Sequence, residues 1–248
     1  PKRLTWYPAR GPGAPRHGSD NQVYGWTPDG AKVLFRSLRD AESAKVESAL
    51  YTVPVTGGLP AKLPMYTAGA GDFSPDGTKL VYSPLFRDFR TWKRYEGGWA
   101  QDLFVYDLAT GTSKVIAPSK RTERDPMWIG GKIYFVSDRD GTLNLYSADP
   151  SGGSVENLTK TTTWDVRWAS SDSVGRIVYE LGGELRLYDV KAKADSALAI
   201  TVPSDGLASR PSRVLADKRI ESFSLSPKGE RALFVARGDV FTAPIENG

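Results

Sequence analysis

The sequence has no cysteine and only one histidine among its 248 residues. Without cysteine, the chain can form no disulfide bond and offers no thiolate ligand to a metal ion. One histidine is too few for a zinc site, and we predict neither a metal nor a cofactor. No apolar run approaches the roughly 18 residues that a membrane-spanning helix requires, so we expect no such helix.

The single histidine, His17, lies in the loop sequence ARGPGAPRHGSD at residues 9–20. A serine hydrolase needs a histidine that is held between a nucleophile and a carboxylate. Ser19 and Asp20 are near neighbours of His17 on one loop, which does not favour that geometry. The sequence also lacks the Gly-x-Ser-x-Gly motif that presents a nucleophilic serine. We therefore predict no catalytic residue in this chain.

The segment DRDGTLN at residues 138–144 begins like a calcium-binding loop. It lacks the glutamate that closes such a loop at the required spacing. We therefore interpret the segment as a hairpin in which aspartates cap a turn.

Charges of the two signs are nearly balanced, with 33 Lys and Arg against 29 Asp and Glu, and they are interspersed. Nucleic acids and anionic membranes call for a one-sided basic face, so we expect neither as a partner. A hydrophobic content of 40% and seven tryptophans are ample for a buried core. The length suits one repeat-built all-β domain.

A pattern with a central glycine recurs along the chain. Each copy has an anchor residue, a tight turn that ends in glycine, and at least three β-forming residues. Where the turn contains Asp-Gly, that pair supplies the positive φ angles of a two-residue hairpin. The copies are WTPDGAKVLF (26–35), FSPDGTKLVYS (73–83), WIGGKIYFVS (128–137), WASSDSVGRIVYE (168–180) and LSPKGERALFV (225–235).

A second pair of strands follows each hairpin, as in DLFVYDLATG (102–111) and NLYSADPSGG (144–153). Four short antiparallel strands thus recur about every 40–55 residues, which predicts an all-β fold of β-propeller blades. We interpret the anchors Trp26, Trp128 and Trp168 as blade core. The most helix-like stretch, RDAESAKVESA at residues 39–49, would be a short and marginal helix.

The repeats also predict the domain organisation. Residues 1–200 are assigned to about four complete blades, preceded by the tail of an earlier blade. A propeller ring must close to cover its blade faces, so these blades are predicted to be part of a larger ring. Residues 201–219 are predicted to be a linker, because proline, serine and mixed charge interrupt the strand pattern. Residues 220–248 open with another hairpin and are predicted to start a second propeller.

The stretch FRDFRTWKRYEGGWAQDLF at residues 86–104 mixes cations with aromatic rings between two predicted strands. A nucleic-acid site is disfavoured, because Asp88, Glu96 and Asp102 weaken any field that attracts phosphate. A second interpretation packs the rings onto the blade and leaves the cations in water. A third places the loop at the rim of a central channel, where its cations meet peptide carboxylates. The candidate substrate-binding residues are Arg87, Arg90, Trp92, Lys93, Arg94 and Tyr95 here, with Arg10 and Arg16 on the loop at 9–20.

Motifs along the whole chain resemble known families. The SPDG hairpins and YDLATG strand are similar to TolB-like propeller repeats. Other motifs resemble, in the same order, segments of tricorn-type proteases, which are serine peptidases of the S41 class. These motifs are KRLTWYP (2–8), GWTPDGAKVLFRS (25–37), RDFRTWKRYEGGWAQDLFVYDL (87–108) and SPKGERALFVARGDVFTAPIENG (226–248).

The tricorn resemblance implies that residues 1–200 form the last four blades of a six-bladed propeller, and that 220–248 open a seven-bladed one. It implies a non-catalytic portion of a larger peptidase, which guides peptides and supports assembly while catalysis occurs elsewhere in that protein. The expected partners are peptides or unfolded polypeptide, the remainder of the protease, and further copies of the chain. The resemblance favours a cytoplasmic location. Two alternatives stay open: a TolB-like interaction propeller without a peptidase, and the gating propeller of a prolyl-oligopeptidase-type enzyme.

Overall fold

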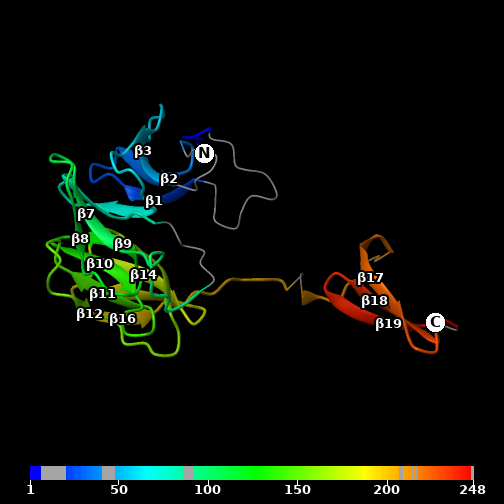
Figure 1. Cartoon of the computed structure of the whole chain (residues 1–248). Coiled ribbons are helices and arrows are strands. Elements are labelled where there is room, and N and C mark those ends of the chain that lie inside the picture. The colour runs from blue at the N-terminus through cyan, green and yellow to red at the C-terminus, as the bar shows by residue number, and fades with distance from the viewer. Residues whose placement is uncertain are drawn as a thin grey trace. The chain divides into compact units, whose positions relative to one another are not determined.

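The chain consists of two compact units, Pro1–Ala199 and Ile200–Gly248. Within the described residues, the first unit contains four antiparallel sheets of four strands each (Figure 1). In every sheet the strands lie in chain order, so each sheet is an up-and-down blade. The blades confirm the predicted all-β propeller fold. The computed structural model describes residues 1–6, 21–40, 48–85, 92–206, 209–213, 215 and 217–246.

The four blades follow one another along the chain, and we number them one to four. Blade one comprises β1 (Gln22–Trp26), β2 (Lys32–Ser37), β3 (Ala49–Pro54) and β4 (Ala61–Lys62). Blade two comprises β5 (Ala70–Phe73), β6 (Lys79–Ser83), β7 (Leu103–Asp107) and β8 (Ser113–Ile116). Blade three comprises β9 (Glu123–Ile129), β10 (Lys132–Ser137), β11 (Asn144–Ala148) and β12 (Glu156–Asn157). Blade four comprises β13 (Val166–Ser171), β14 (Arg176–Leu181), β15 (Glu184–Asp189) and β16 (Ala194–Ala197).

The hairpin between β1 and β2 is longer than the predicted two-residue turn. Five residues separate the strands, and Gly30 adopts a positive φ of 67°. The N–H of Gly30 donates to the carbonyl of Thr27 at 2.8 Å, and the carboxylate of Asp29 accepts from the N–H of Ala31 at 3.0 Å. The two-residue prediction is wrong because the aspartate supports a wider turn, in which only the glycine needs the left-handed conformation.

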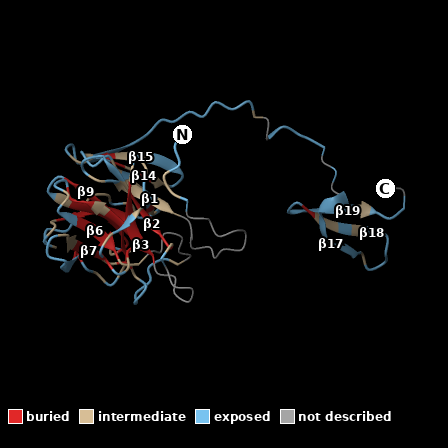
Figure 2. Ribbon diagram, turned by 90° about the horizontal axis from the view of Figure 1, so that it is seen from above, coloured by how far each residue is buried: buried red, intermediate tan, exposed pale blue. Residues whose placement is uncertain are grey.

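Packing between neighbouring blades forms the core. Strand β10 is buried on both faces, and its side chains alternate between two clusters, as the pleat of a strand requires. Ile133 and Phe135 join the cluster shared with blade two. Tyr134 and Val136 join the cluster shared with blade four. Figure 2 shows the buried residues concentrated in the sheets of this unit. The uninterrupted apolar run in β10 therefore reflects a strand between two neighbours.

The second unit contains a three-stranded antiparallel sheet, which follows a short 3-10 turn at Asp217–Arg219. Its strands are β17 (Ile220–Leu225), β18 (Arg231–Ala236) and β19 (Asp239–Pro244). Among the described residues of this unit, only Ala236 is buried. The division of the chain into blades, a linker at 201–219 and the start of a second propeller stays a prediction.

Residues 41–47 of the helix predicted at 39–49 lie outside the described residues, and Ala49 already belongs to β3. The part of the chain that the structure describes contains no candidate membrane-spanning helix.

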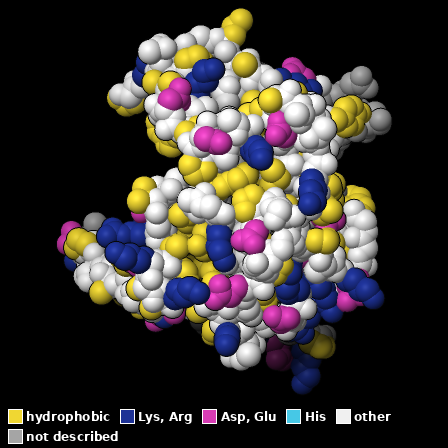
Figure 3. Space-filling model, turned by 90° about the vertical axis from the view of Figure 1, so that its left-hand side faces the viewer, with side chains coloured by type: hydrophobic (Ala, Val, Ile, Leu, Met, Phe, Trp, Pro, Cys, Tyr) yellow, Lys and Arg dark blue, Asp and Glu magenta, His cyan; other side chains and the backbone are white. Residues whose placement is uncertain are grey.

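On the face in Figure 3, lysines and arginines lie beside aspartates and glutamates, with hydrophobic side chains in a hollow between them.

Candidate binding site in the inner cleft

The first strands of the four blades lie next to one another and line a cleft. Contacts join β1 to β5, β5 to β9, and β9 to β13. The cleft has a volume of about 820 Å³, a size typical of ligand sites. We name it the inner cleft, and its walls comprise residues 22–28, 30, 71–73, 75, 125–128 and 168–174.

Tryptophan side chains form part of these walls. Trp128 is only 5% exposed and packs with Val81 and Leu103 of blade two, which confirms its predicted place in the core. Trp26 and Trp168 are 57% and 47% exposed, so the prediction that they are core residues is wrong. A β-bulge precedes Trp26 in β1, and another coincides with Trp168 in β13. Strand β9 has a bulge as well, so Trp128 differs from these two rings because side chains of blade two cover it.

Asp72 in β5 reaches towards both neighbouring blades. Its Oδ2 atom accepts a hydrogen bond of 2.7 Å from the N–H of Trp128 in β9. Its Oδ1 atom lies beside β1, 3.8 Å from where a Cβ atom on Gly25 would stand. Burial raises the pKa of Asp72 to about 6, although the N–H groups of Trp128 and Phe73 oppose this effect. The carboxyl group is therefore mainly ionised at neutral pH.

The carboxylate of Asp125 and the ring of Trp168 hold the guanidinium group of Arg124 between blades three and four. The Nε atom of Arg124 donates to Oδ1 of Asp125 at 3.0 Å. The guanidinium carbon of Arg124 lies 5.4 Å from the ring centroid of Trp168, which is a cation–π contact. Asp125 and Trp168 both have positive φ angles, 51° and 54°. Such a backbone costs a non-glycine residue about 1–3 kcal/mol, and it concentrates at functional sites.

A third carboxylate reaches the inner cleft from the turn between β13 and β14. Oδ1 of Asp172 accepts hydrogen bonds from the N–H groups of residues 174, 175 and 176 at 2.8–2.9 Å. Although partial burial acts to raise it, these donors hold the pKa of Asp172 below its usual value. Within the described residues, the charged side chains that line the cleft are Asp72, Asp125 and Asp172.

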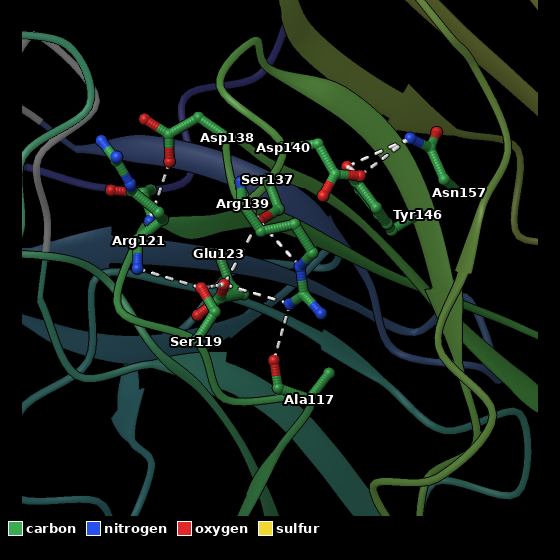
Figure 4. Close-up of polar contacts among 11 residues, drawn as sticks. Ala117, Ser119, Arg121, Glu123, Ser137, Asp138, Arg139, Asp140, Tyr146 and Asn157 are labelled. Atoms are coloured by element: carbon green, nitrogen blue, oxygen red, sulfur yellow. Dashed lines mark hydrogen bonds and ion pairs between the residues drawn. The ribbon is translucent and has the colours of Figure 1, made fainter.

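A separate buried polar cluster lies where β9 begins (Figure 4). Glu123 is fully buried. Its Oε1 atom accepts hydrogen bonds from Ser119 at 2.6 Å, from Ser137 at 3.2 Å and from Arg139 at 3.1 Å. Burial raises the pKa of Glu123 to about 7, and the nearby charge of Asp102 acts in the same direction.

The arginine of this cluster belongs to a motif that occurs in two blades. The guanidinium of Arg139 lies over the rings of Phe135 and Tyr146, 5.4 and 5.1 Å from their centroids. In blade one, Arg39 lies over two rings in the same way, at 5.2 and 5.0 Å. Because these groups contact one another within a blade, we interpret the cluster as structural.

Four of the eight predicted substrate-binding residues lie outside the described residues. So do the single histidine and the adjacent serine and aspartate. Among the residues that are described, no group of three or more acidic or histidine side chains is placed to hold a metal ion. The predicted residues outside the described parts are Arg10, Arg16, Arg87 and Arg90.

The charged members of the predicted site that are described contact blade three and the segment that joins it to blade four. Lys93 forms an ion pair of 2.5 Å with Asp165. Nε of Arg94 donates to the carbonyl of Gly141 at 2.6 Å, and its N–H donates to Asp138 at 3.1 Å. The segment 138–144, interpreted as a hairpin capped by aspartates, thus uses a carboxylate to hold the loop of blade two.

The aromatic members of the predicted site pack against each other. The ring centroid of Trp92 lies 5.9 Å from that of Tyr95 and 6.3 Å from that of Trp99. None of the four described members, Trp92, Lys93, Arg94 and Tyr95, lines the inner cleft. Their contacts favour the interpretation that the loop packs onto its own protein. Their role in substrate binding stays a prediction.

Sequence analysis missed the aspartates of the inner cleft. One signal could have found Asp72: it directly precedes the anchor Phe73, at the position where the first repeat has Gly25. A carboxylate at this point of a strand that faces the ring centre is unusual for a core position. Asp125 has no such signal, because its position depends on the bulge in β9.

Comparison with known proteins finds similarity to one region of the tricorn proteases. A family model described as the tricorn protease N-terminal beta propeller domain matches residues 1–194. The tricorn protease homolog of Saccharolobus solfataricus is 26% identical over 240 residues. The alignment covers 97% of this chain and 21% of that relative, so the chain spans about a fifth of the relative's length.

Two solved structures share the fold. A crystal structure of the tricorn protease has a TM-score of 0.52 at 22% identity, covering 88% of this chain and 26% of that one. TolB from Acinetobacter baumannii has a TM-score of 0.57 at 19% identity, covering 93% of this chain and 55% of that one. At these identities the likeness concerns the fold alone, and the fold is the predicted β-propeller.

Proposed function

Because a family model matches residues 1–194, the chain belongs to the family of tricorn protease N-terminal β-propeller domains, and we propose that it guides peptides within a tricorn-like serine peptidase. In this proposal the inner cleft contacts substrates or products in transit, and the blades support assembly with the remainder of the protease. Peptide hydrolysis takes place at residues outside this chain.

The observation that carries the proposal is the inner cleft itself. Each strand that lines it is the first of its blade, and within the described residues it pairs with one other strand. The other edge presents backbone N–H and C=O groups, to which an extended peptide can hydrogen-bond without regard to its sequence. The volume of about 820 Å³ suffices for several peptide residues. A cleft of this kind suits transit of varied peptides better than recognition of one ligand.

A first prediction concerns peptide binding by the chain. Ten-residue peptides of mixed sequence are expected to change the tryptophan fluorescence, because the half-exposed Trp26 and Trp168 line the cleft. Replacing Ser170, an exposed cleft residue, with tryptophan should fill part of the cleft and weaken binding about tenfold. The measurement is a titration of each variant, with dissociation constants checked by calorimetry.

The matched control is Ser151→Trp, which adds the same side chain to the exposed turn between β11 and β12. This variant should bind peptides like the unmodified protein. Equal affinity of the Ser170→Trp and Ser151→Trp variants would contradict peptide binding in the inner cleft. If no peptide binds at all, the guiding function is wrong.

A second prediction concerns catalysis. Because the proposal places hydrolysis elsewhere in the protease, this chain alone should release no product from fluorogenic peptides above the buffer rate. A His17→Ala variant should show the same background. Cleavage that the His17→Ala change abolishes would assign the chemistry to this chain and overturn the proposal.

A further inference from the structure

The inner cleft combines an anionic wall with exposed aromatic rings. Its charged wall residues within the described parts of the chain are three aspartates, whereas the chain as a whole carries a net charge of +4. The rings of Trp26 and Trp168 are about half exposed in the same cleft. Carboxylates attract cations, and indole faces bind them through the ring quadrupole. The chemistry of the walls therefore favours a positively charged ligand group.

Arg124 demonstrates how these walls hold a cation. Its guanidinium donates to the carboxylate of Asp125 at 3.0 Å and lies 5.4 Å from the ring centroid of Trp168. One carboxylate and one indole of the cleft thus bind an internal cation together. This pairing also balances the charge of Asp125, whereas the hydrogen bond that holds Asp72 comes from a neutral backbone N–H.

The neighbouring part of the wall is formed by Asp72 and the end of β1. The Oδ2 atom of Asp72 is held by the N–H of Trp128 at 2.7 Å, which fixes the orientation of the carboxylate. Its Oδ1 atom lies beside Gly25, which has no side chain to cover it. The next residue of β1 is Trp26, with 57% of its surface exposed. A carboxylate and an indole ring thus both line the inner cleft.

We infer that the inner cleft recognises a cationic group of a peptide, either an α-ammonium group or a lysine or arginine side chain, with Asp72 as its anionic partner and Trp26 as its aromatic partner. The inference rests on the proposed function and names the chemistry that the guided peptide presents. A charge-assisted hydrogen bond to Asp72 gives direction. The indole of Trp26 adds an attraction that any alkylammonium or guanidinium group satisfies.

The test compares four peptides of equal length that differ in charge. One is acetylated and neutral, one has a free amino terminus, one is acetylated with an internal lysine, and one is acetylated with an internal glutamate. At least one of the two cationic peptides should bind about tenfold more tightly than the neutral peptide, and the glutamate peptide most weakly. The cationic peptide that gains affinity identifies the source of the recognised group.

Two cleft variants and one control variant locate the residues that produce this preference. Asp72→Asn keeps an oxygen for the N–H of Trp128 but removes the charge, so the preference for cationic peptides should fall to about twofold or less. Asp76→Asn removes a carboxylate from the turn after β5, outside the cleft wall, and should leave the preference unchanged. Trp26→Leu, at an exposed position, should reduce the preference without affecting folding.

The outcomes separate the inference from the proposed function. If all four peptides bind equally, or if Asp72→Asn keeps the preference of the unmodified protein, cation recognition is overturned while peptide guiding stands. If none of the peptides binds, both fail. Thermal melts of each variant check that the comparison concerns folded protein.

Discussion

Replacing Gly71 with alanine is expected to lower the free energy of unfolding by about 2–3 kcal/mol, the upper range for overpacking a core. Gly71 lies in β5, where blade one meets blade two. A Cβ atom there would stand 2.9 Å from the backbone oxygen of Val81 and 2.8 Å from a methyl group of Leu50. The leucine can rotate, but the carbonyl belongs to the neighbouring strand β6, which is fixed by its own hydrogen bonds.

The measurement is chemical denaturation of the purified variant, with Gly131→Ala as the control. A Cβ atom added at Gly131 would meet no atom within 4 Å, and this glycine does not adopt a positive φ. Alanine there should leave the free energy of unfolding within about 0.5 kcal/mol. Equal stabilities for Gly71→Ala and Gly131→Ala would show that β5 and β6 do not approach as closely as described.

This glycine shows what the sequence could and could not predict about the fold. The hairpin FSPDGTKLVYS predicts two strands around a turn, and β5 and β6 form there. The pattern of Leu80, Val81 and Tyr82 predicts a buried strand, because apolar residues fill both of its faces. In the sequence, Gly71 indicates only a position at which a strand is less stable. Its role depends on the close approach of β6 and of Leu50 in blade one, which is not encoded in any local pattern.

The candidate site was less predictable than the fold. Aromatic anchors recur in the repeat, so Trp26, Trp128 and Trp168 look equivalent in sequence. They differ in the structure because side chains of blade two cover Trp128, although β1, β9 and β13 all contain a bulge. Bulges depend on the pairing between strands and leave little trace in a single sequence. The conspicuous residues Lys93 and Arg94, by contrast, contact residues far away in the chain, just before β13 and in the turn between β10 and β11.

The buried Glu123 leads to the second large effect, a loss of stability with rising pH. Burial raises its pKa from 4.5 to about 7 in the folded protein. A carboxyl group with a higher pKa in the folded state binds its proton more tightly there than in the unfolded state. The free energy of unfolding therefore falls as the pH rises from about 4.5 to about 7, and this contribution is constant above that range. The expected loss is on the order of 2–3 kcal/mol.

The variant that tests this is Glu123→Gln. The amide oxygen of glutamine can still accept hydrogen bonds from Ser119, Ser137 and Arg139, but the side chain does not titrate. Denaturation of both proteins between pH 4.5 and pH 8 should show a difference in stability that grows with pH in favour of the variant. Asp72, whose pKa is raised to about 6, changes the free energy of unfolding with pH equally in both proteins. Its contribution therefore cancels when the two free energies are subtracted.

Glu184→Gln provides the control, because this glutamate has an exposed side chain and lies on β15, away from the cluster. It should reproduce the pH dependence of the unmodified protein. The hydrogen bond from Ser119 and the guanidinium of Arg139, 3.1 Å from Glu123, oppose this pH dependence, since both favour the ionised carboxylate. If stability rises between pH 4.5 and pH 7 and Glu123→Gln removes that rise, this ion pair outweighs desolvation. The cluster would then be a stabilising salt bridge instead of a buried acid that carries a proton below pH 7.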